Sequence, residues 1–161
     1  MTTLYVDNIA PNLQSKISAP NLTLPTGSVV QVKSDTSTTQ TNTSSTSYGD
    51  TQLSVSITPT SSSSKVFVMM YCSVRADQIT GAGGHVRVMR DNTQIGEQNY
   101  MGWNNAAHYG QDTSHMEILD SPATTSAVTY KVQVRTQTAG QTINFGHDNG
   151  LQGITLMEIA G

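Results

Sequence analysis

The amino-acid sequence predicts an all-β protein, a single antiparallel β-sandwich of the jelly-roll-like kind with eight or nine strands. The main observation is that apolar side chains recur at every second position between Lys65 and Gly161, in short runs separated by polar or glycine-containing breaks. Successive side chains of a strand point to opposite faces, so this period of two indicates strands with one buried face. In addition, no segment keeps the i, i+3, i+4, i+7 pattern of a helix over three turns. Short, evenly spaced strands are typical of a two-sheet sandwich.

The composition narrows the functional classes. The chain has 161 residues, enough for one domain and a short arm, and only 35% of them are apolar. Its formal net charge is −3 and its eight Lys and Arg residues are scattered, so we expect no nucleic-acid partner. No apolar run is long enough to span a bilayer, and the first residues lack a basic and then apolar leader, so we expect neither membrane insertion nor Sec export. Cys72 lies in an apolar strand and is predicted to be a buried, unreactive thiol.

Residues 1–28 differ from the rest and are predicted to form an N-terminal arm, with the sandwich domain in residues 29–161. Proline at three positions interrupts this segment and favours extended or turn conformations. Its apolar residues follow no helical period and are too many for a free linker. We therefore expect an extended arm that docks on another protein through Leu4, Val6, Ile9 and Leu13.

The strands are predicted in order along the chain. Residues 28–32 form the first, and residues 34–47, of which eleven of fourteen are Ser or Thr, are interpreted as a long polar edge strand rather than as disorder because Thr is β-branched. The Asp91-Asn92 pair predicts a hairpin turn. The remaining strands are predicted at residues 53–58, 65–75, 85–90, 94–100, 109–119, 130–135 and 154–159, and the chain returns through Ile143 and Phe145 before the last of them.

Two of these strands are apolar on both faces, which is unusual for a sandwich sheet with one face in water. One side of strand 65–75 carries Val66, Val68, Met70, Cys72 and Val74. If this side faces the core, then Phe67, Met69 and Tyr71 face outward. These three are predicted to be covered either by a sister subunit or by the chain's own arm, and both alternatives stay open. In strand 154–159 the position of Glu158 leaves the two faces unassigned.

No group of residues predicts catalysis, a metal site or a cofactor. The four histidines have no paired spacing and no cysteine cluster accompanies them. The sequence contains neither a nucleophile elbow nor a phosphate-binding glycine loop. The protein is therefore expected not to be an enzyme.

A binding site is predicted in two loops that combine aromatic rings with amide groups. A ring stacks on the face of a sugar while amides bond its hydroxyl groups, so the combination suits a host surface glycan. Packing of Trp103 in the core or between subunits is the alternative for the first loop, and a simple turn is the alternative for the second. The candidate contacts are Tyr100, Trp103, Asn104, Asn105 and Tyr109, with His147, Asp148 and Asn149.

Five segments, taken together and in this order, resemble the C-terminal domain of phage virion proteins that are often described as tail fibres and are common in marine and cyanobacterial phages. The resemblance covers about residues 29–160, and the first 28 residues also look like the attachment segments that precede such domains. The segments are Ser63-Ser64-Lys65-Val66, Val88-Met89-Arg90-Asp91, Leu119-Asp120-Ser121-Pro122, Thr129-Tyr130-Lys131-Val132-Gln133-Val134-Arg135 and Ile154-Thr155-Leu156-Met157-Glu158-Ile159.

The resemblance implies a non-enzymatic domain that forms a homotrimer on a bacteriophage particle assembled in the bacterial cytoplasm. The arm would bind other virion proteins and the distal loops would face the host. The leading expectation is a short tail fibre or adsorption protein. A capsid decoration or head-fibre protein is the nearest alternative, and a free carbohydrate-binding module is another.

Overall fold

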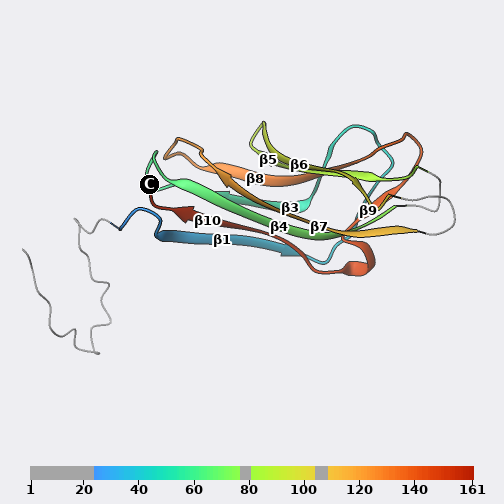
Figure 1. The fold of residues 1–161 in the computed structure, drawn as a ribbon, viewed down its shortest axis with the longest axis horizontal. Helices are drawn as coiled ribbons and strands as arrows, with labels where there is room; N and C mark the ends of the chain where they lie inside the picture. Colours follow the sequence, from blue (N-terminus) through green and yellow to red (C-terminus); the bar gives the residue numbers. More distant parts are fainter. Residues whose placement is uncertain (1–23, 77–80, 104–108) are drawn as a thin grey trace, which may run out of the picture.

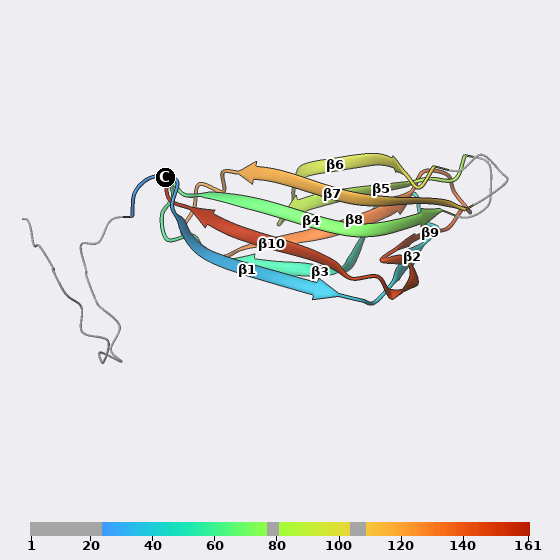
Figure 2. The same cartoon turned by 60° about the horizontal axis from the view of Figure 1, so that its bottom comes forward.

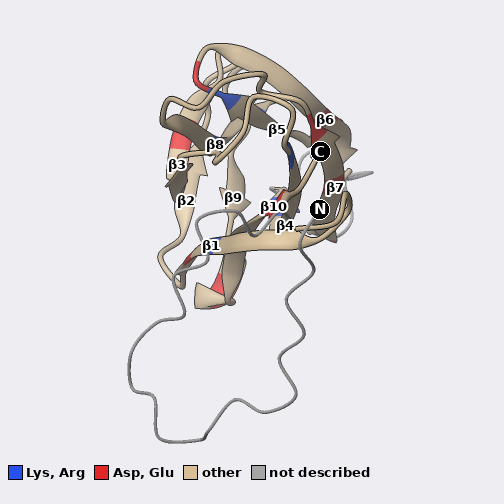
Figure 3. Ribbon diagram, turned by 90° about the vertical axis from the view of Figure 1, so that its left-hand side faces the viewer, with Lys and Arg blue, Asp and Glu red and all other residues tan. Residues whose placement is uncertain are grey.

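The protein is described here as a computed structural model that covers residues 24–76, 81–103 and 109–161. These residues form two antiparallel sheets that pack face to face, as the sequence predicted (Figure 1). Viewed along the strands, the sheets appear as two curved layers (Figure 3). The predicted arm contacts Leu4, Val6, Ile9 and Leu13 lie outside the described residues.

Ten strands and one short 3-10 turn occur within the described ranges. The sequence predicts eight or nine strands, because it gives the segment 143–145 only as a return of the chain and places residues 41–43 within the long strand over residues 34–47. In chain order the elements are β1 (Val29–Ser37), β2 (Thr41–Thr43), β3 (Gly49–Ile57), β4 (Lys65–Ala76), β5 (Gly84–Arg90), β6 (Thr93–Met101), β7 (Gly110–Asp120), β8 (Val128–Thr136), β9 (Ile143–Phe145), η1 (His147–Asn149) and β10 (Gln152–Ile159).

The order of the strands is that of a jelly roll. One sheet has the order β1-β10-β4-β9-β2, with β7 on the free side of β4, and the other has the order β3-β8-β5-β6. Figure 2 shows β7, β4, β10 and β1 side by side, with the short β9 and β2 at one end. Without β2 and β9, the first strand pairs with the last and the second with the last but one, which is the nesting of two Greek keys.

Strand β4 organises the first sheet. It pairs with β7 along its whole length, with β10 over its first half and with β9 at its end. Its alternate residues Val66, Val68, Met70, Cys72 and Val74 are all buried between the sheets, in agreement with the face predicted from the sequence. Side chains of β8 and β5 oppose them, and the resulting core is almost wholly aliphatic apart from Tyr130 and Phe145.

The predicted long strand over residues 34–47 is wrong. β1 ends at Ser37 because its partner β10 begins at Gln152, which is paired with Ser37, so the ladder stops there. The buried Gln152 side chain then donates a hydrogen bond to the Thr39 carbonyl at 2.6 Å and holds the turn that follows. The chain crosses to β9 and forms the short β2. The Ser/Thr-rich segment is therefore two edge strands.

Glu158, whose face could not be assigned from the sequence, points into the sandwich and is fully buried. It accepts hydrogen bonds of 2.7 Å from Gln31 Nε2, from the Thr60 backbone N–H and from Thr60 Oγ1. Burial acts to raise the pKa of this carboxyl, but the hydrogen bonds outweigh it and hold the pKa below its ordinary value. The carboxylate therefore stays ionised and joins β1, β10 and the β3–β4 connection.

A second buried polar cluster joins the two sheets near the same end. Arg90 Nη1, at the end of β5, lies 2.8 Å from both carboxylate oxygens of Asp120, at the end of β7. Tyr130 Oη donates to Asp120 Oδ2 at 2.7 Å. Burial, and then the Asp120 carboxylate, raise the pKa of Tyr130. Asp120 thus accepts hydrogen bonds that hold the fold together, and both of its carboxylate oxygens are already paired.

The two ends of the sandwich differ. The first described residues, 24–28, lie beside the chain's C-terminus, where the Gly27 N–H donates to the Ala160 carbonyl at 2.8 Å. The segments around Gly83, Trp103 and Ala76 lie at the opposite end (Figure 1). We call these the arm end and the tip. The described part of the predicted arm, residues 24–28, and the described residues of the predicted binding loops therefore lie at opposite ends.

We predict that Glu158→Gln lowers the stability by about 1–3 kcal/mol at neutral pH, because an amide cannot accept all the hydrogen bonds that the carboxylate accepts. A carboxylate with a lowered pKa stabilises the fold above the ordinary glutamate pKa of about 4.3, and this contribution is lost as the pH falls through the folded-state value. The variant should therefore lose less stability in acid than the unmodified protein does.

Urea unfolding at a fixed protein concentration between neutral and acidic pH measures both effects. Glu117→Gln, at an exposed glutamate of β7, is the matched control and should leave the pH dependence unchanged. An unaltered acid slope in Glu158→Gln would contradict the assignment of Glu158 as an ionised buried acceptor.

Candidate functional site

The outer face of the β7-β4-β10-β1 sheet is apolar toward the arm end. Cross-strand pairing places Leu119, Phe67, Met157 and Val32 in one row across these four strands. Leu119 is 55% exposed and Val32 is 53% exposed, although both are large aliphatic side chains. We call the following set the apolar face: Val29, Val32, Phe67, Met69, Leu119, Met157 and Ile159.

The predicted interface residues Phe67, Met69 and Tyr71 all lie on this outer side, as expected. Phe67 and Met69 are partly buried by their neighbours, whereas Tyr71 is 39% exposed. Tyr71 lies across Gly153 of β10, where any side chain would meet the tyrosine ring at 2.9 Å. A hollow of about 200 Å³ opens beside Met69 and Tyr71 and is closed on its far side by His115 and Glu117 of β7.

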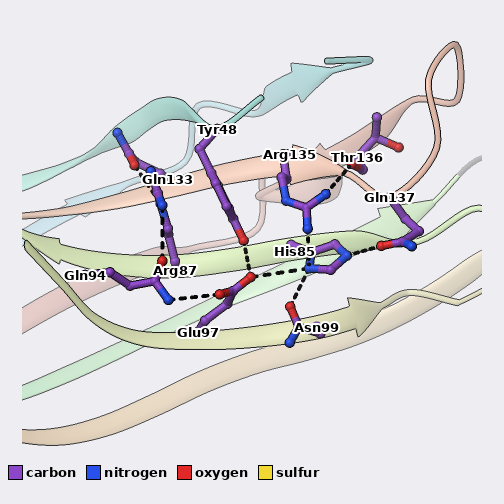
Figure 4. Close-up of polar contacts among 10 residues, drawn as sticks. All are labelled: Tyr48, His85, Arg87, Gln94, Glu97, Asn99, Gln133, Arg135, Thr136 and Gln137. Carbon is purple, nitrogen blue, oxygen red and sulfur yellow. Dashed lines mark hydrogen bonds and ion pairs between the residues drawn. The ribbon is translucent and has the colours of Figure 1, made fainter. Parts of the chain in front are cut away.

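The outer face of the other sheet is polar and closely hydrogen-bonded (Figure 4). Arg87 Nε donates to Gln133 Oε1 at 2.8 Å, and the Arg87 guanidinium lies 3.8 Å from the centre of the Tyr48 ring. Tyr48 Oη in turn donates to Glu97. These contacts belong to an outer polar network made of Tyr48, His85, Arg87, Gln94, Glu97, Asn99, Gln133, Arg135, Thr136 and Gln137.

His85 is the buried centre of this network. Its Nδ1 lies 3.1 Å from Arg135 Nη2 and its Nε2 contacts Gln137 Oε1. The same Nδ1 also faces the acceptor oxygens of Glu97, at 3.4 Å, and of Asn99. Sequence reasoning gave His85 no role, because its partners come from β6 and β8 and no local spacing marks them.

The electrostatics of the network keep its charges in fixed states. Burial raises the pKa of Tyr48 to about 12, and its hydrogen bond to Glu97 adds to this shift. The same bond, together with those from Gln94 and His85, lowers the pKa of Glu97. Tyr48 therefore stays protonated and Glu97 stays ionised near neutral pH. This face satisfies its polar groups within the chain, in contrast to the apolar face.

At the tip, the predicted aromatic residues form two separate contacts rather than one platform. Tyr100 and Trp103 meet edge to face with their ring centres 5.5 Å apart, and Tyr100 also lies 5.4 Å from the His85 ring. Trp103 is 53% exposed, yet it packs closely on the backbone at Gly83, where an added Cβ would lie 3.1 Å from the indole. Trp103 is thus partly a packing residue, and the predicted partners Asn104 and Asn105 lie outside the described residues.

The second contact joins Tyr109 and His147, two of the predicted residues, through Arg75. The Arg75 guanidinium lies 3.6 Å from the centre of the Tyr109 ring, and its Nη1 lies 3.0 Å from His147 Nε2. Asp148 and Asn149 follow on the exposed side of η1 with left-handed backbone angles, and Asp148 Oδ2 lies 3.3 Å from His147 Nε2. Sequence reasoning gave Arg75 no role in joining these two side chains, although its outward position at the end of strand 65–75 was a usable signal.

Other kinds of site find little support in the described ranges. They contain no group of three or more His, Cys, Asp or Glu side chains placed to hold a metal ion. Burial raises the pKa of the Cys72 thiol to about 12, so the thiol stays protonated. No helix in the described part of the chain has the length and apolar character needed to span a membrane.

Comparison with known proteins gives distant structural likenesses and no sequence family. No family model and no curated protein matches the chain. A mutant VP2 protein of infectious bursal disease virus, from derived T=1 particles, matches with a TM-score of 0.45 and 11% identity over 99% of this chain and 44% of that one. A VP2 subviral particle of the same virus matches with a TM-score of 0.44 and 10% identity over 90% and 45%.

A Stig cyclase, Fisc from Fischerella sp. TAU, matches with a TM-score of 0.37 and 10% identity over 71% of this chain and 56% of its own. The chain spans less than half the length of the two VP2 chains described above. At these scores none of the likenesses carries an argument about function, and the resemblance to phage virion proteins stays a prediction.

We predict that Gly110→Ala disrupts the tip. A Cβ at Gly110 would collide with the Gly102 carbonyl, because the β6 and β7 ends meet there backbone to backbone. Since backbone cannot move aside cheaply, we expect a loss of roughly 1–3 kcal/mol in unfolding free energy. Gly49→Ala is the matched control, because nothing lies within 4 Å of the added Cβ there. Calorimetric melting of both variants measures the difference, and an equal Tm would contradict the close approach.

Proposed function

We propose that this chain is a non-enzymatic structural protein of a bacteriophage virion, a short tail fibre or adsorption protein that acts as a homotrimer. The arm docks on the particle and the tip faces the host. The observation that carries the proposal is the contrast between the two outer faces: one sheet satisfies its polar groups within the chain, whereas the other presents exposed Val32 and Leu119 in an apolar row. Such a face indicates burial against a partner.

The partner that fits the apolar face best is another copy of the same chain. The face spans four strands, and with neighbouring strands about 4.8 Å apart its width is about 15 Å. A single extended arm would cover only part of that width, whereas a second sheet can pack over all of it at about 10 Å. The hollow beside Met69 and Tyr71 offers a place for a side chain from that neighbour. The number of copies, three, comes from the resemblance.

The polarity of the molecule supports an adsorption role over the nearest alternative, a capsid decoration or head-fibre protein. The described chain starts at one end, and the exposed Tyr100, Trp103 and Tyr109 lie at the other, where β6 ends and β7 begins. A decoration protein would need the arm and the apolar face but has no use for exposed aromatic rings far from the shell. A jelly roll also suits a lectin-type domain, which is why a free carbohydrate-binding module is the other alternative. The apolar face argues against it, because a free monomer would leave that face in water.

We predict that Val32→Lys combined with Leu119→Lys converts the assembled protein into folded monomers. Each well-covered apolar side chain contributes roughly 1.5–3 kcal/mol, so two buried charges in their place should raise the Kd of assembly by at least about 100-fold. Both side chains are more than half exposed in the single chain, so the monomer should still fold. Sedimentation velocity measures the change, and Gln52→Lys on the exposed side of β3 is the control.

A stable monomer of the unmodified full-length protein would contradict assembly through this face. If the arm covers the face instead, deletion of residues 1–23 should change the association state, whereas the two lysines should not. Either result would mean that copies of the chain do not meet through the apolar face.

We predict that deletion of residues 1–23 abolishes incorporation into particles of the encoding phage and leaves a folded, assembled sandwich. The deletion keeps residues 24–28, whose backbone bonds to Ala160 belong to the described fold. Incorporation is measured by the protein content of purified particles, and electron microscopy of a labelled chain gives its position on head or tail. Normal incorporation of the truncated chain would contradict the role of the arm, and a label on the head would favour the decoration alternative.

A further inference from the structure

A groove on the outer side of β4 and β7, close to the tip, is separate from the apolar face. It has a volume of about 380 Å³ and lies between η1 on one side and the start of β7 on the other. We call it the tip groove, and its lining residues are Ser73, Val74, Gln111, Asp112, Thr113 and His147. It continues the same sheet surface whose other half, toward the arm end, is apolar.

The lining of the tip groove offers hydrogen-bonding groups of both kinds. Ser73 and Thr113 supply hydroxyls, Gln111 an amide and His147 an imidazole, whereas Asp112 is paired with the buried Val74 and directs its side chain to the opposite face of β7. Hydroxyl and amide groups both donate and accept. Gln111 and Thr113 are exposed, so their groups are accessible. A ligand covered with hydroxyl groups, each able to donate and accept, matches this lining.

The wall formed by η1 is held rigidly against the sheet. The Gly146 N–H donates to the Ser73 carbonyl at 2.8 Å, and Ser73 Oγ donates to the His147 carbonyl at 3.2 Å. Arg75 fixes the His147 ring from the other direction through its contact at 3.0 Å. A site that is already ordered before the ligand arrives loses less conformational entropy on binding.

An aromatic ring and further amides lie at the tip side of the groove. Tyr109 is 46% exposed although Arg75 covers one face of its ring. Pairing between strands places Gln111, Arg75, Asn144 and Asn42 in one row across β7, β4, β9 and β2. A ring beside a row of amides is the combination that recognises a sugar, since the ring packs on the C–H face and the amides bond the hydroxyls.

The charges around the groove select among sugars. Arg75 is partly covered by Tyr109 and His147, whereas the Asp148 carboxylate is exposed beside the groove. This accessible carboxylate disfavours a uronic acid, a sialic acid or a phosphorylated sugar. We propose that the tip groove is a binding site for an uncharged hexopyranoside. This gives the adsorption role proposed above its binding site and rests on that role for its biological purpose, but the binding itself requires only the folded protein.

The test uses the purified full-length protein and two sets of probes. The methyl glycosides of glucose, galactose, mannose and N-acetylglucosamine are the uncharged probes, and glucuronic acid and N-acetylneuraminic acid are the charged ones. Saturation-transfer NMR detects binding, and shifts of backbone amide signals locate it. We expect an uncharged glycoside to shift the amides of residues 111–113 and 147–149, with a Kd of about 1 mM, which is typical of a shallow site.

Matched variants then assign the contacts. Gln111→Ala and Thr113→Ala should each raise the Kd by about tenfold. Gln52→Ala, at an exposed glutamine of the opposite sheet, should leave it unchanged. The amide shifts of the unmodified protein locate the site even if a variant fails to fold.

Three results would overturn the proposal: no binding of any uncharged probe at about 50 mM, far above a millimolar Kd; binding of the charged probes alone; or binding abolished by Trp103→Ala and not by Gln111→Ala. None of them bears on whether the chain assembles or joins a particle. Conversely, a chain that binds the glycoside at the groove but stays monomeric would retain this site and lose the virion role.

Discussion

The register of β4 is the constraint on which the rest of the structure depends. This strand has hydrogen-bonded partners on both sides, so its alternation decides which side chains of β7, β10 and β9 face inward. With Val68 and Met70 buried, Phe67 and Met69 must face outward, and their cross-strand neighbours Leu119 and Met157 must face outward with them. A shift of one residue would exchange the two faces completely. The apolar face is therefore a geometric consequence of the core.

The two outer faces have different thermodynamic roles. The outer polar network costs little in water, because its donors and acceptors are already paired and its long side chains also cover the sheet beneath them. The apolar face has no such compensation, and every exposed aliphatic group on it favours association. Within one surface of the β4 sheet, the apolar half lies toward the arm end and the tip groove lies toward the other. The association proposed through the apolar face would therefore leave the groove open, because the two halves do not overlap.

Sequence periodicity was sufficient for the fold class, the inward and outward faces of β4 and the Asp91-Asn92 hairpin, because each depends on local alternation or on turn chemistry. It was insufficient for Glu158, since a carboxylate in an apolar strand is intelligible only when Gln31 and Thr60, far away in the chain, are known to donate to it. The end of β1 at Ser37 was not predicted for a related reason, because a strand ends where its partner ends. Arg75 was missed in the same way: its contacts with Tyr109 and His147 come from two other segments.

The segments that carry the resemblance to phage virion proteins coincide with the polar residues that close the sandwich. Arg90, Asp120 and Tyr130 form one buried cluster, Glu158 forms the other, and Asp91 Oδ1 accepts from the Thr129 N–H at 2.9 Å at the β5–β6 turn. A buried charged group tolerates little change, because losing one partner leaves the other unpaired at a cost of several kcal/mol. Such residues report a shared framework and say little about the ligand. The tip groove draws on none of these five segments, so its residues can change while the framework of the sandwich stays the same.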